Sequence, residues 1–364
     1  MTEKLARTPL YEEHVALGGK MVPFAGFTMP VQYSSGALKE YHVVRDGGAG
    51  LFDISHMGQV SISGNGALDF LQYVATNDVS QLADGQVQYS ALLNKAGTFI
   101  DDITTYRINE NEYYLCINAA NRHKDVAHLQ KQAAQFDVDV SDESDDTVLL
   151  ALQGASAQRI LQPLVDADLE GIGYYRFSQT SINGADGIVS RTGYTGEDGF
   201  EIYLPNTAAG GVWTQLLQTG AAPIGLAARD MLRTEMGYAL YGHEISAGVT
   251  PVESKLMWIT RLDKGAFIGR DAVAARKKEG PKKHLIALKL IGRGIPREHY
   301  KVFVGGVESG EITSGMHSPI AGGVALAWVK PEHVAEGEIS VEIRGKQVLA
   351  ERTKTPFVRS NVRR

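Results

Sequence analysis

The polar residues best suited to chemistry fall on the strands of one predicted β-meander. Residues 86–118 have the alternation of three strands, with a first turn at Asn94–Gly97. Counting across the first turn places Tyr89 opposite Asp102. Counting across the second places Asp102 opposite residue 119, which is next to Asn118. A hydroxyl, a carboxylate and an amide side by side could hold a polar ligand, and the carboxylate could handle a proton. The ordinary alternative is a set of surface carboxylates and core tyrosines on half-buried sheets.

A second predicted hairpin adds another polar pair. Counting across Gly196–Gly199 places Tyr194 opposite Glu201 on one face. Glu201 could accept two N–H bonds from an amidine-like edge, as in a pterin ring, while tyrosines could supply ring faces and hydroxyls. Arg229 and Arg233 stand four residues apart on a predicted helix. Such a pair usually belongs to a structural salt-bridge network, and its functional alternative is a carboxylate-binding site.

Composition restricts the class of protein. The chain has 364 residues, so two or three domains are expected. Its formal net charge of -6 disfavours non-specific nucleic-acid binding. No apolar run is long enough to span a bilayer and no signal peptide is visible, so we expect a cytoplasmic protein with no membrane contact. The one cysteine, Cys116, lies in an apolar stretch and is expected to be a buried structural residue.

Several familiar site patterns are missing or incomplete. The chain contains no GxxxxGK[ST] phosphate loop. Gly64 and Gly66 follow a predicted strand, but Asp69 occupies the third glycine position of a dinucleotide fingerprint. The histidines form no HExxH pattern, and the spacing of His123 and His128 puts them on different faces of a helix. We therefore expect neither a metal ion nor a flavin.

The remaining sequence indicates mixed elements followed by a β-rich end. Residues 121–135 are predicted to form a helix, because apolar residues recur there at helical spacing. The charged stretch 275–284 carries a Gly-Pro break and is the expected domain boundary, with its basic residues on a solvated linker. Nearly everything after it has the pattern of short strands, which predicts a small C-terminal β-barrel or jelly roll.

From end to end, the chain resembles the glycine cleavage T-protein family. The resemblance rests on many ordered matches, so it is far more specific than any one of them. The matching stretches are TPLYEEHVALGGKMVPFAGFTMPVQY (8–33), LFDISHMG (51–58), TND (76–78), GTFIDD (97–102), NAANRHKD (118–125), SRTGYTGEDGFEIYLP (190–205), GLAARDMLRTEMG (225–237), FIGRDA (267–272), EITSGMHSP (311–319) and PFVR (356–359).

The resemblance implies an α+β fold of three domains. They form a cloverleaf of mainly antiparallel sheets with flanking helices, around a central hole that holds tetrahydrofolate. The implied first domain is discontinuous and folate-binding, over residues 1–55 and 145–275. A ferredoxin-like α+β domain over residues 56–144 is inserted into it and carries Asp102. Residues 282–364 form the C-terminal β-barrel domain.

The resemblance also implies a reaction, partners and site residues. Members of the family take the aminomethyl group carried on the lipoyl arm of H-protein, release ammonia and form 5,10-methylenetetrahydrofolate. This implies an aminomethyltransferase of glycine catabolism, with tetrahydrofolate as co-substrate and lipoylated H-protein as partner; P-protein and L-protein share that carrier. Asp102, the second aspartate of FIDD, resembles the catalytic residue. The positions that resemble folate contacts are Met57, Tyr89, Asn118, Tyr194, Glu201, Arg229 and Arg359.

Some positions depart from the family pattern, and two alternatives stay open. His243, Ala227 and His317 replace residues that are usual in the family, but none belongs to the proposed site. One alternative is a folate-dependent demethylase of the dimethylglycine or sarcosine type, which usually has a flavin domain attached. The other is a non-catalytic folate-binding protein used in iron–sulfur protein maintenance. Its motif KGCYxGQ is absent here and the FIDD aspartate is present, which favours the transferase.

Overall fold

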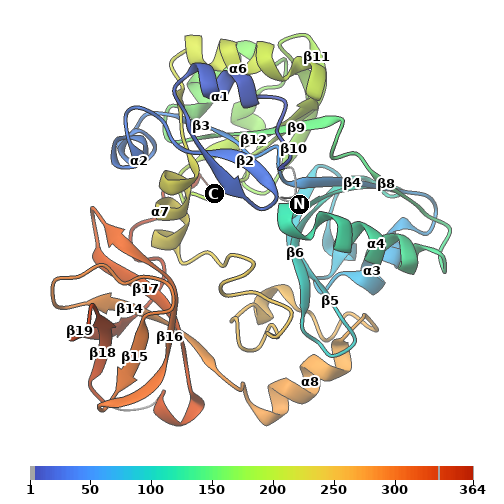
Figure 1. Ribbon diagram of the computed structural model, residues 1–364. Helices are drawn as coiled ribbons and strands as arrows, with labels where there is room; N and C mark the ends of the chain where they lie inside the picture. Colours follow the sequence, from blue (N-terminus) through green and yellow to red (C-terminus); the bar gives the residue numbers. More distant parts are fainter. Residues whose placement is uncertain (1–4, 335–336, 364) are drawn as a thin grey trace.

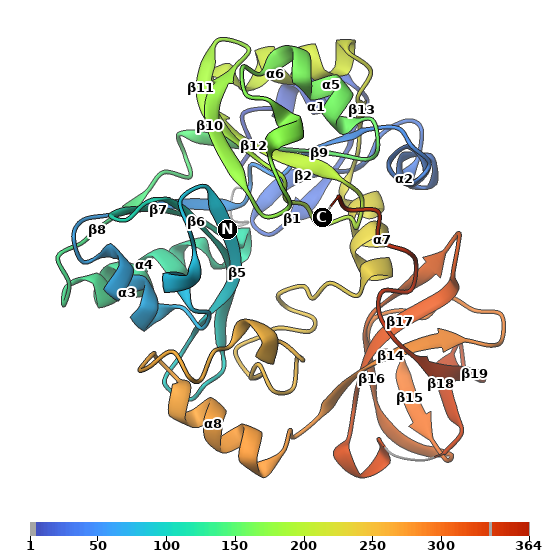
Figure 2. The same cartoon turned by 180° about the vertical axis from the view of Figure 1, so that it is seen from behind.

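The computed structural model describes residues 5–334 and 337–363. Three lobes, each built on its own sheet, surround the middle of the molecule (Figures 1 and 2). Helices and mainly antiparallel strands are mixed along the chain, which confirms the expected α+β class. Within the described ranges, no helix is long and apolar enough to cross a membrane.

The first lobe contains a six-stranded sheet in the order β10-β11-β12-β9-β3-β13. Its neighbours pair antiparallel, except for the parallel pair β13 and β3. The strands are β3 (Gly50–Asp53), β9 (Thr147–Gln153), β10 (Phe177–Ile182), β11 (Ala185–Ser190), β12 (Gly199–Pro205) and β13 (Ala222–Pro223). The helices are α1 (Tyr11–Ala16), α2 (Ala37–Arg45), α5 (Ala157–Leu161), α6 (Ala209–Gln218) and α7 (Leu226–Met236). A separate hairpin joins β1 (Lys20–Phe24) to β2 (Phe27–Gln32).

The sheet of the first lobe is buried on both faces, which explains the nearly continuous apolar run of β9. Leu150 faces the core that contains Trp213 of α6. Leu149 faces the opposite core, which contains Tyr41 of α2 and Leu232 of α7. Helix α7 packs on this second face and also contacts the C-terminal barrel (Figure 1). The helix ends at Gly237, whose φ of 70° is a left-handed conformation that suits glycine.

The second lobe is a five-stranded antiparallel sheet in the order β5-β6-β7-β4-β8, with two helices. Its first three strands are the predicted meander, which is confirmed together with the helix that follows. The elements are β4 (Gly58–Ser63), α3 (Ala67–Val74), β5 (Gln86–Leu93), β6 (Phe99–Asn109), β7 (Glu112–Ile117), α4 (Arg122–Ala133) and β8 (Asp139–Asp142).

The register within the meander differs from the prediction. Tyr89 pairs with Thr104, and Asp102 pairs with Ala91, so the predicted pairing of Tyr89 with Asp102 is wrong by two residues. The turn is one residue longer than counted, because Leu93 pairs with Phe99, and a β-bulge beside Leu93 inserts one more residue on β6. An offset of two keeps both side chains on the same face of the sheet.

The second hairpin departs further from its predicted register. Glu201 pairs with Ser190 rather than lying opposite Tyr194. The strands stop pairing after Ser190, and residues 191–198 form a long loop instead of a tight turn. Tyr194 therefore reaches its position from a loop.

The third lobe is a closed six-stranded barrel in the order β14-β17-β16-β15-β18-β19, which confirms the expected C-terminal barrel. Its strands are β14 (His284–Leu290), β15 (Lys301–Val304), β16 (Val307–Ser318), β17 (Gly322–Val329), β18 (Ile339–Ile343) and β19 (Lys346–Thr353). The basic stretch before it is not all linker, because α8 (Arg270–Glu279) includes its first half. The division into domains at the residues expected from the sequence stays a prediction.

The chain returns to the first lobe after leaving the barrel (Figure 2). The amide of Phe357 donates to the carbonyl of Glu235 at 2.7 Å, and that of Asn361 donates to Gly196 at 2.8 Å. The buried Glu235 carboxylate in turn binds Arg45 of α2 at 2.8 Å and accepts a hydrogen bond from Ser318 of the barrel. These contacts fix the first lobe against the barrel.

Candidate functional site

Asp102 of β6 has both carboxyl oxygens held by hydrogen bonds. The Tyr89 hydroxyl donates to Oδ2 at 2.8 Å, and Asn118 Nδ2 donates to Oδ1 at 2.8 Å. The predicted grouping of these three residues is therefore present, although the predicted cross-strand partner was wrong. Burial, reinforced by the charge of Asp101, raises the pKa of Asp102 to about 7, while the two hydrogen bonds oppose this rise. A carboxyl of this kind can accept a proton or remain charged near neutral pH.

Sequence reasoning missed the role of Asp101, which is fully buried behind Asp102. The backbone amide and Nδ2 of Asn118 donate to Asp101 at 2.8 and 2.9 Å, and Nδ2 of Asn121 donates at 2.5 Å. Because Asn118 binds both aspartates, Asp101 determines where the Asn118 amide meets Asp102. Its signal in the sequence is the first aspartate of FIDD, which strand alternation directs away from the second.

An exposed aromatic residue stands beside this group and was not predicted. The Trp258 ring lies 5.7 Å from the Tyr89 ring between centroids, and the residue is 64% exposed. It belongs to the segment between α7 and α8, which no strand or helix pattern marks in the sequence. Trp258 therefore places an apolar surface next to the carboxylate group.

The second polar group comes from the first lobe. The Arg229 guanidinium of α7 lies 4.9 Å from the centre of the Tyr194 ring, and the Tyr194 hydroxyl donates to the Ala239 carbonyl at 2.5 Å. Glu201 accepts a hydrogen bond from Thr192 at 2.5 Å through Oε2. Burial raises the pKa of Glu201 and lowers the pKa of Arg229, and the opposite charges of these two residues counteract both shifts. The sequence did not predict a role for Thr192, because the predicted tight turn placed it in a strand rather than in the loop that carries it.

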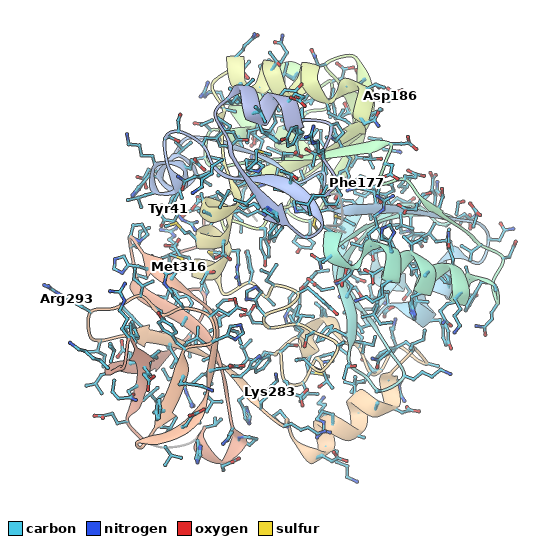
Figure 3. The ribbon with its side chains drawn as sticks, in the orientation of Figure 1. Tyr41, Phe177, Asp186, Lys283, Arg293 and Met316 are labelled. Carbon is cyan, nitrogen blue, oxygen red and sulfur yellow. The ribbon has the colours of Figure 1, made fainter. Side chains whose placement is uncertain are left out.

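Electrostatic effects connect the two groups. Burial chiefly raises the pKa of Tyr194, and the charge of Asp102 raises it as well. Burial also raises the pKa of Tyr89, and the charges of Asp102 and Tyr194 add to that rise. The groups thus approach each other from two lobes, and side chains extend from all three lobes into the space between the ribbons (Figure 3).

The other predicted positions have less distinctive surroundings. Met57 is partly buried and packs against the core that contains Cys116. Cys116 itself is buried and free, as expected. Arg359 is exposed on the C-terminal segment and makes no hydrogen bond or ion pair with other described residues. Arg233 is 2% exposed and binds Asp230 at 2.7 Å and Ser314 at 2.9 Å. It therefore belongs to a structural salt-bridge network rather than to a carboxylate-binding site.

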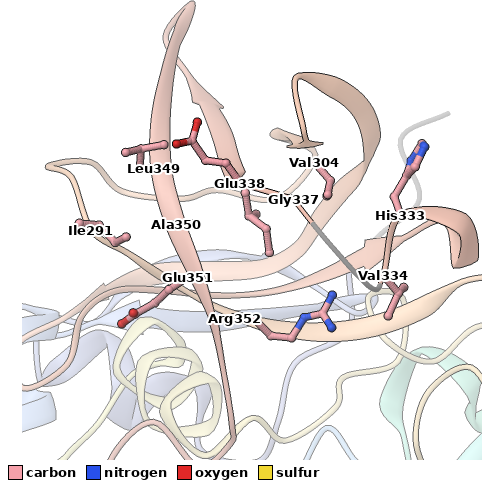
Figure 4. A pocket seen from close by; sticks show the side chains of 11 residues that line it. Ile291, Val304, His333, Val334, Gly337, Glu338, Leu349, Ala350, Glu351 and Arg352 are labelled. Atoms are coloured by element: carbon pink, nitrogen blue, oxygen red, sulfur yellow. The ribbon is translucent and has the colours of Figure 1, made fainter.

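A cavity of about 360 Å³ lies elsewhere, in the barrel (Figure 4). Residues of the last two strands and the segment before them line it, including His333, Glu351 and Arg352. None of the predicted site residues lines it. Across residues 5–334 and 337–363, no three His, Cys, Asp or Glu side chains are grouped so that they could hold a metal ion.

Family comparisons agree with the arrangement of the lobes. Residues 10–264 match the model of the GCVT N-terminal domain, and residues 283–359 match that of the glycine cleavage T-protein C-terminal barrel domain. The chain belongs to the glycine cleavage T-protein family. Several aminomethyltransferases are similar to it along nearly the whole chain. That of Rubrobacter xylanophilus is 47% identical over 98% of this chain and 95% of its own length.

Two further relatives extend the comparison. The aminomethyltransferase of Desulfitobacterium hafniense is 46% identical over 96% of this chain and 97% of its own length. The crystal structure of glycine cleavage system aminomethyltransferase T from Bartonella henselae superposes with a TM-score of 0.93 at 35% identity, covering 99% of this chain and all of that one. The expected family, the fold and the enzyme class of aminomethyltransferase are confirmed by these matches.

Proposed function

We propose that this T-protein transfers the methylene carbon of an aminomethyl group from lipoylated H-protein to tetrahydrofolate. The products are ammonia, the free lipoyl thiol and 5,10-methylenetetrahydrofolate. The observation that carries the proposal is the Asp102 carboxyl, which Tyr89 and Asn118 fix and whose charge acts on Tyr194 of the second polar group. A non-catalytic folate-binding protein has no evident need for a carboxyl whose pKa is raised to about 7.

The donor and acceptor set suits a reduced pterin. Glu201 uses only Oε2 among the described residues, so Oε1 can accept an N–H of the ligand. Arg229 Nη1 is buried and lacks a hydrogen-bond partner among the same residues. A buried donor without a partner costs free energy in a folded protein, which favours an acceptor atom of a ligand at this position. The rings of Tyr194 and Tyr89 add flat surfaces for the heterocycle.

Tetrahydrofolate supplies the two nitrogens that receive the carbon. The protein must bring those nitrogens to the aminomethyl carbon, stabilise positive charge as ammonia leaves, and accept protons as the new bonds form. Asp102 is placed for the last two tasks, because a half-buried carboxylate interacts strongly with a nearby cation and is half protonated near neutral pH. Tyr89 and Asn118 hold its two oxygens so that its orientation is set before the substrates bind.

A reconstituted assay tests the proposal. Aminomethyl-loaded H-protein and tetrahydrofolate are mixed with the protein, and ammonia and methylenetetrahydrofolate are measured. We expect folate-dependent formation of both products, and a loss of roughly 10²–10⁴-fold in Asp102→Asn, the usual contribution of a general acid–base group.

A matched control is Asp139→Asn, which changes an exposed aspartate on β8 of the same sheet. It should retain full activity. Folate binding without turnover in the wild-type protein would contradict the proposal and favour the non-catalytic alternative. Full turnover in Asp102→Asn would leave the transferase reaction intact but remove Asp102 from its centre.

A further inference from the structure

A third aspartate lies behind the two of β6, on helix α4. Asp125 is fully buried, and Leu129 and Ala133 lie at the same helical face at successive intervals of four residues. An aspartate on the apolar face of a helix is unusual, because burying a charged carboxylate without partners costs a large free energy. Its protonation state therefore needs a structural account.

The surroundings of Asp125 offer no donor that would stabilise a charge. Among the described residues, neither carboxyl oxygen of Asp125 meets an N–H or O–H group. The carboxyl faces the carboxyl of Asp101 instead. Two carboxyl groups can share a hydrogen bond only when one of them carries the proton.

Asp101 is the member of this pair whose surroundings suit a negative charge. It already accepts three N–H bonds from Asn118 and Asn121, and such bonds favour the ionised form. The charge of Lys124 acts on Asp125, but its ammonium donates to the Ile100 carbonyl, to Asn121 and to Tyr241. Burial, followed by the charge of Asp101, raises the pKa of Asp125 to about 11; Asp102 adds to the rise and Lys124 opposes it.

We propose that Asp125 is a neutral carboxylic acid that donates its proton in a hydrogen bond to Asp101, and that it thereby positions the reacting carboxylate. The connection runs from Asp125 to Asp101, from Asp101 to the Asn118 amide, and from Asn118 to Asp102. Asp125 is a positioning residue, since it reaches Asp102 only through the other two. Its catalytic consequence rests on the proposed function, but its protonation state does not.

A neutral Asp125 also limits the charge beside Asp102. Asp101 already raises the pKa of Asp102 by its charge. A second anion behind it would raise that pKa further and leave Asp102 protonated at neutral pH. A donor at position 125 instead holds one charge in place and adds none. An asparagine there can supply the same donor without any ionisable group.

Infrared spectroscopy tests the protonation state directly. The wild-type protein at pH 8 should show a protonated-carboxyl C=O band that Asp125→Asn removes. The matched control is Asp142→Asn on β8, whose carboxylate is paired with Arg122 at 3.0 Å and which should leave that band unchanged. If Asp125→Asn removes only carboxylate absorption, Asp125 is ionised and the proposal is wrong. This readout needs no turnover, so it stands apart from any failure of the proposed function.

The pH profile of kcat/KM tests the positioning role. Asp125→Ala leaves Asp101 without its donor. We expect about 10-fold lower activity, which is the effect of one lost hydrogen bond to a charged group. We also expect the acid limb of the profile to move to higher pH. Asp125→Asn should restore most of the activity and the wild-type limb. If Asp125→Asn instead moves the limb to lower pH, a negative charge has been removed and the proposal fails. If Asp125→Ala does not fold, the asparagine variant alone decides between these outcomes.

Discussion

The Tyr89 hydroxyl donates to Asp102 Oδ2 at 2.8 Å although neither residue is the other's backbone partner. The bond runs diagonally across β5 and β6, on one face of the sheet. A diagonal neighbour is within reach of a long aromatic side chain. Because the hydroxyl stabilises the charged carboxylate, it holds the pKa of Asp102 below the value that burial and Asp101 would produce.

Tyr89→Phe should therefore move the acid limb of the activity profile upward. The substitution removes one hydrogen bond to the charged form and leaves the ring in place. A hydrogen bond to a charged group contributes roughly 1.5–3 kcal/mol, so its loss should raise the pKa of Asp102 by about one unit or more. We expect a limb near pH 7 in the wild-type enzyme, where Asp102 titrates, and a limb near pH 8 in the variant. The measurement is kcat/KM against pH in the reconstituted assay.

Tyr73→Phe on α3 is the matched control, because it removes a tyrosine hydroxyl far from Asp102 in the chain and leaves its ring contact with Phe136. Its profile should match the wild type. A Tyr89→Phe profile that stays in place, or moves to lower pH, would show that the hydroxyl does not stabilise the Asp102 carboxylate.

Asp101→Asn should move the same limb in the opposite direction. The Asp101 charge raises the pKa of Asp102, so removing it lowers that pKa and keeps Asp102 ionised to lower pH. The asparagine oxygen can still accept from Asn118, which limits the structural effect. We expect the acid limb to fall below pH 7 by a measurable fraction of a unit, as recorded in the same assay. A limb that rises would mean that loss of Asn118 positioning outweighs the charge.

The sequence predicts the elements of this fold better than their register. The meander from Gln86 to Ile117 follows from alternation and turn residues, which are local properties. No local signal marks the bulge beside Leu93 or the length of the loop that carries Tyr194, and a register prediction is sensitive to a single residue. The grouping of Tyr89 with Asp102 survives because a shift of two residues keeps the face.

The buried polar residues of the site were not predicted from the hydrophobic periodicity. Asp125 falls in register with Leu129 and Ala133, so the helical spacing contained a signal of a carboxyl in a core. Asp101 alternates with Asp102 in the same way on a strand. A charged residue on the apolar face of a predicted element would have identified both positions.

Glu201→Gln should weaken tetrahydrofolate binding while leaving the fold intact. The substitution replaces one of two acceptor oxygens with a donor and removes the charge opposite Arg229. We expect about 10- to 100-fold weaker binding, which is the effect of losing a hydrogen bond to a charged group. Isothermal titration of tetrahydrofolate measures it. Glu342→Gln, an exposed glutamate on β18, is the control, and equal affinities for both variants would remove Glu201 from the folate site.

Asp125→Asn should stabilise the protein increasingly as the pH rises. The pKa of Asp125 is about 11 in the folded protein and about 4 in the unfolded chain. Between these values the folded state holds a proton that the unfolded state has released. The free energy of unfolding therefore decreases with rising pH, by up to about 1.4 kcal/mol per unit from this group. Asparagine does not titrate, so the variant lacks this decrease.

Chemical denaturation at pH 5 and at pH 8 measures the effect as a difference between variant and wild type. That difference should grow in favour of Asp125→Asn by at least about 1 kcal/mol over this range. This is about a quarter of the largest change that one group can cause over three pH units. Asp142→Asn should show no such growth, because its carboxylate is paired with the Arg122 guanidinium rather than with another carboxyl group. A constant difference for Asp125→Asn would mean that Asp125 has the same protonation state in the folded and unfolded chains. Asp101 and Asp125 would then both be anions behind Asp102, and the proposed hydrogen bond between them could not form.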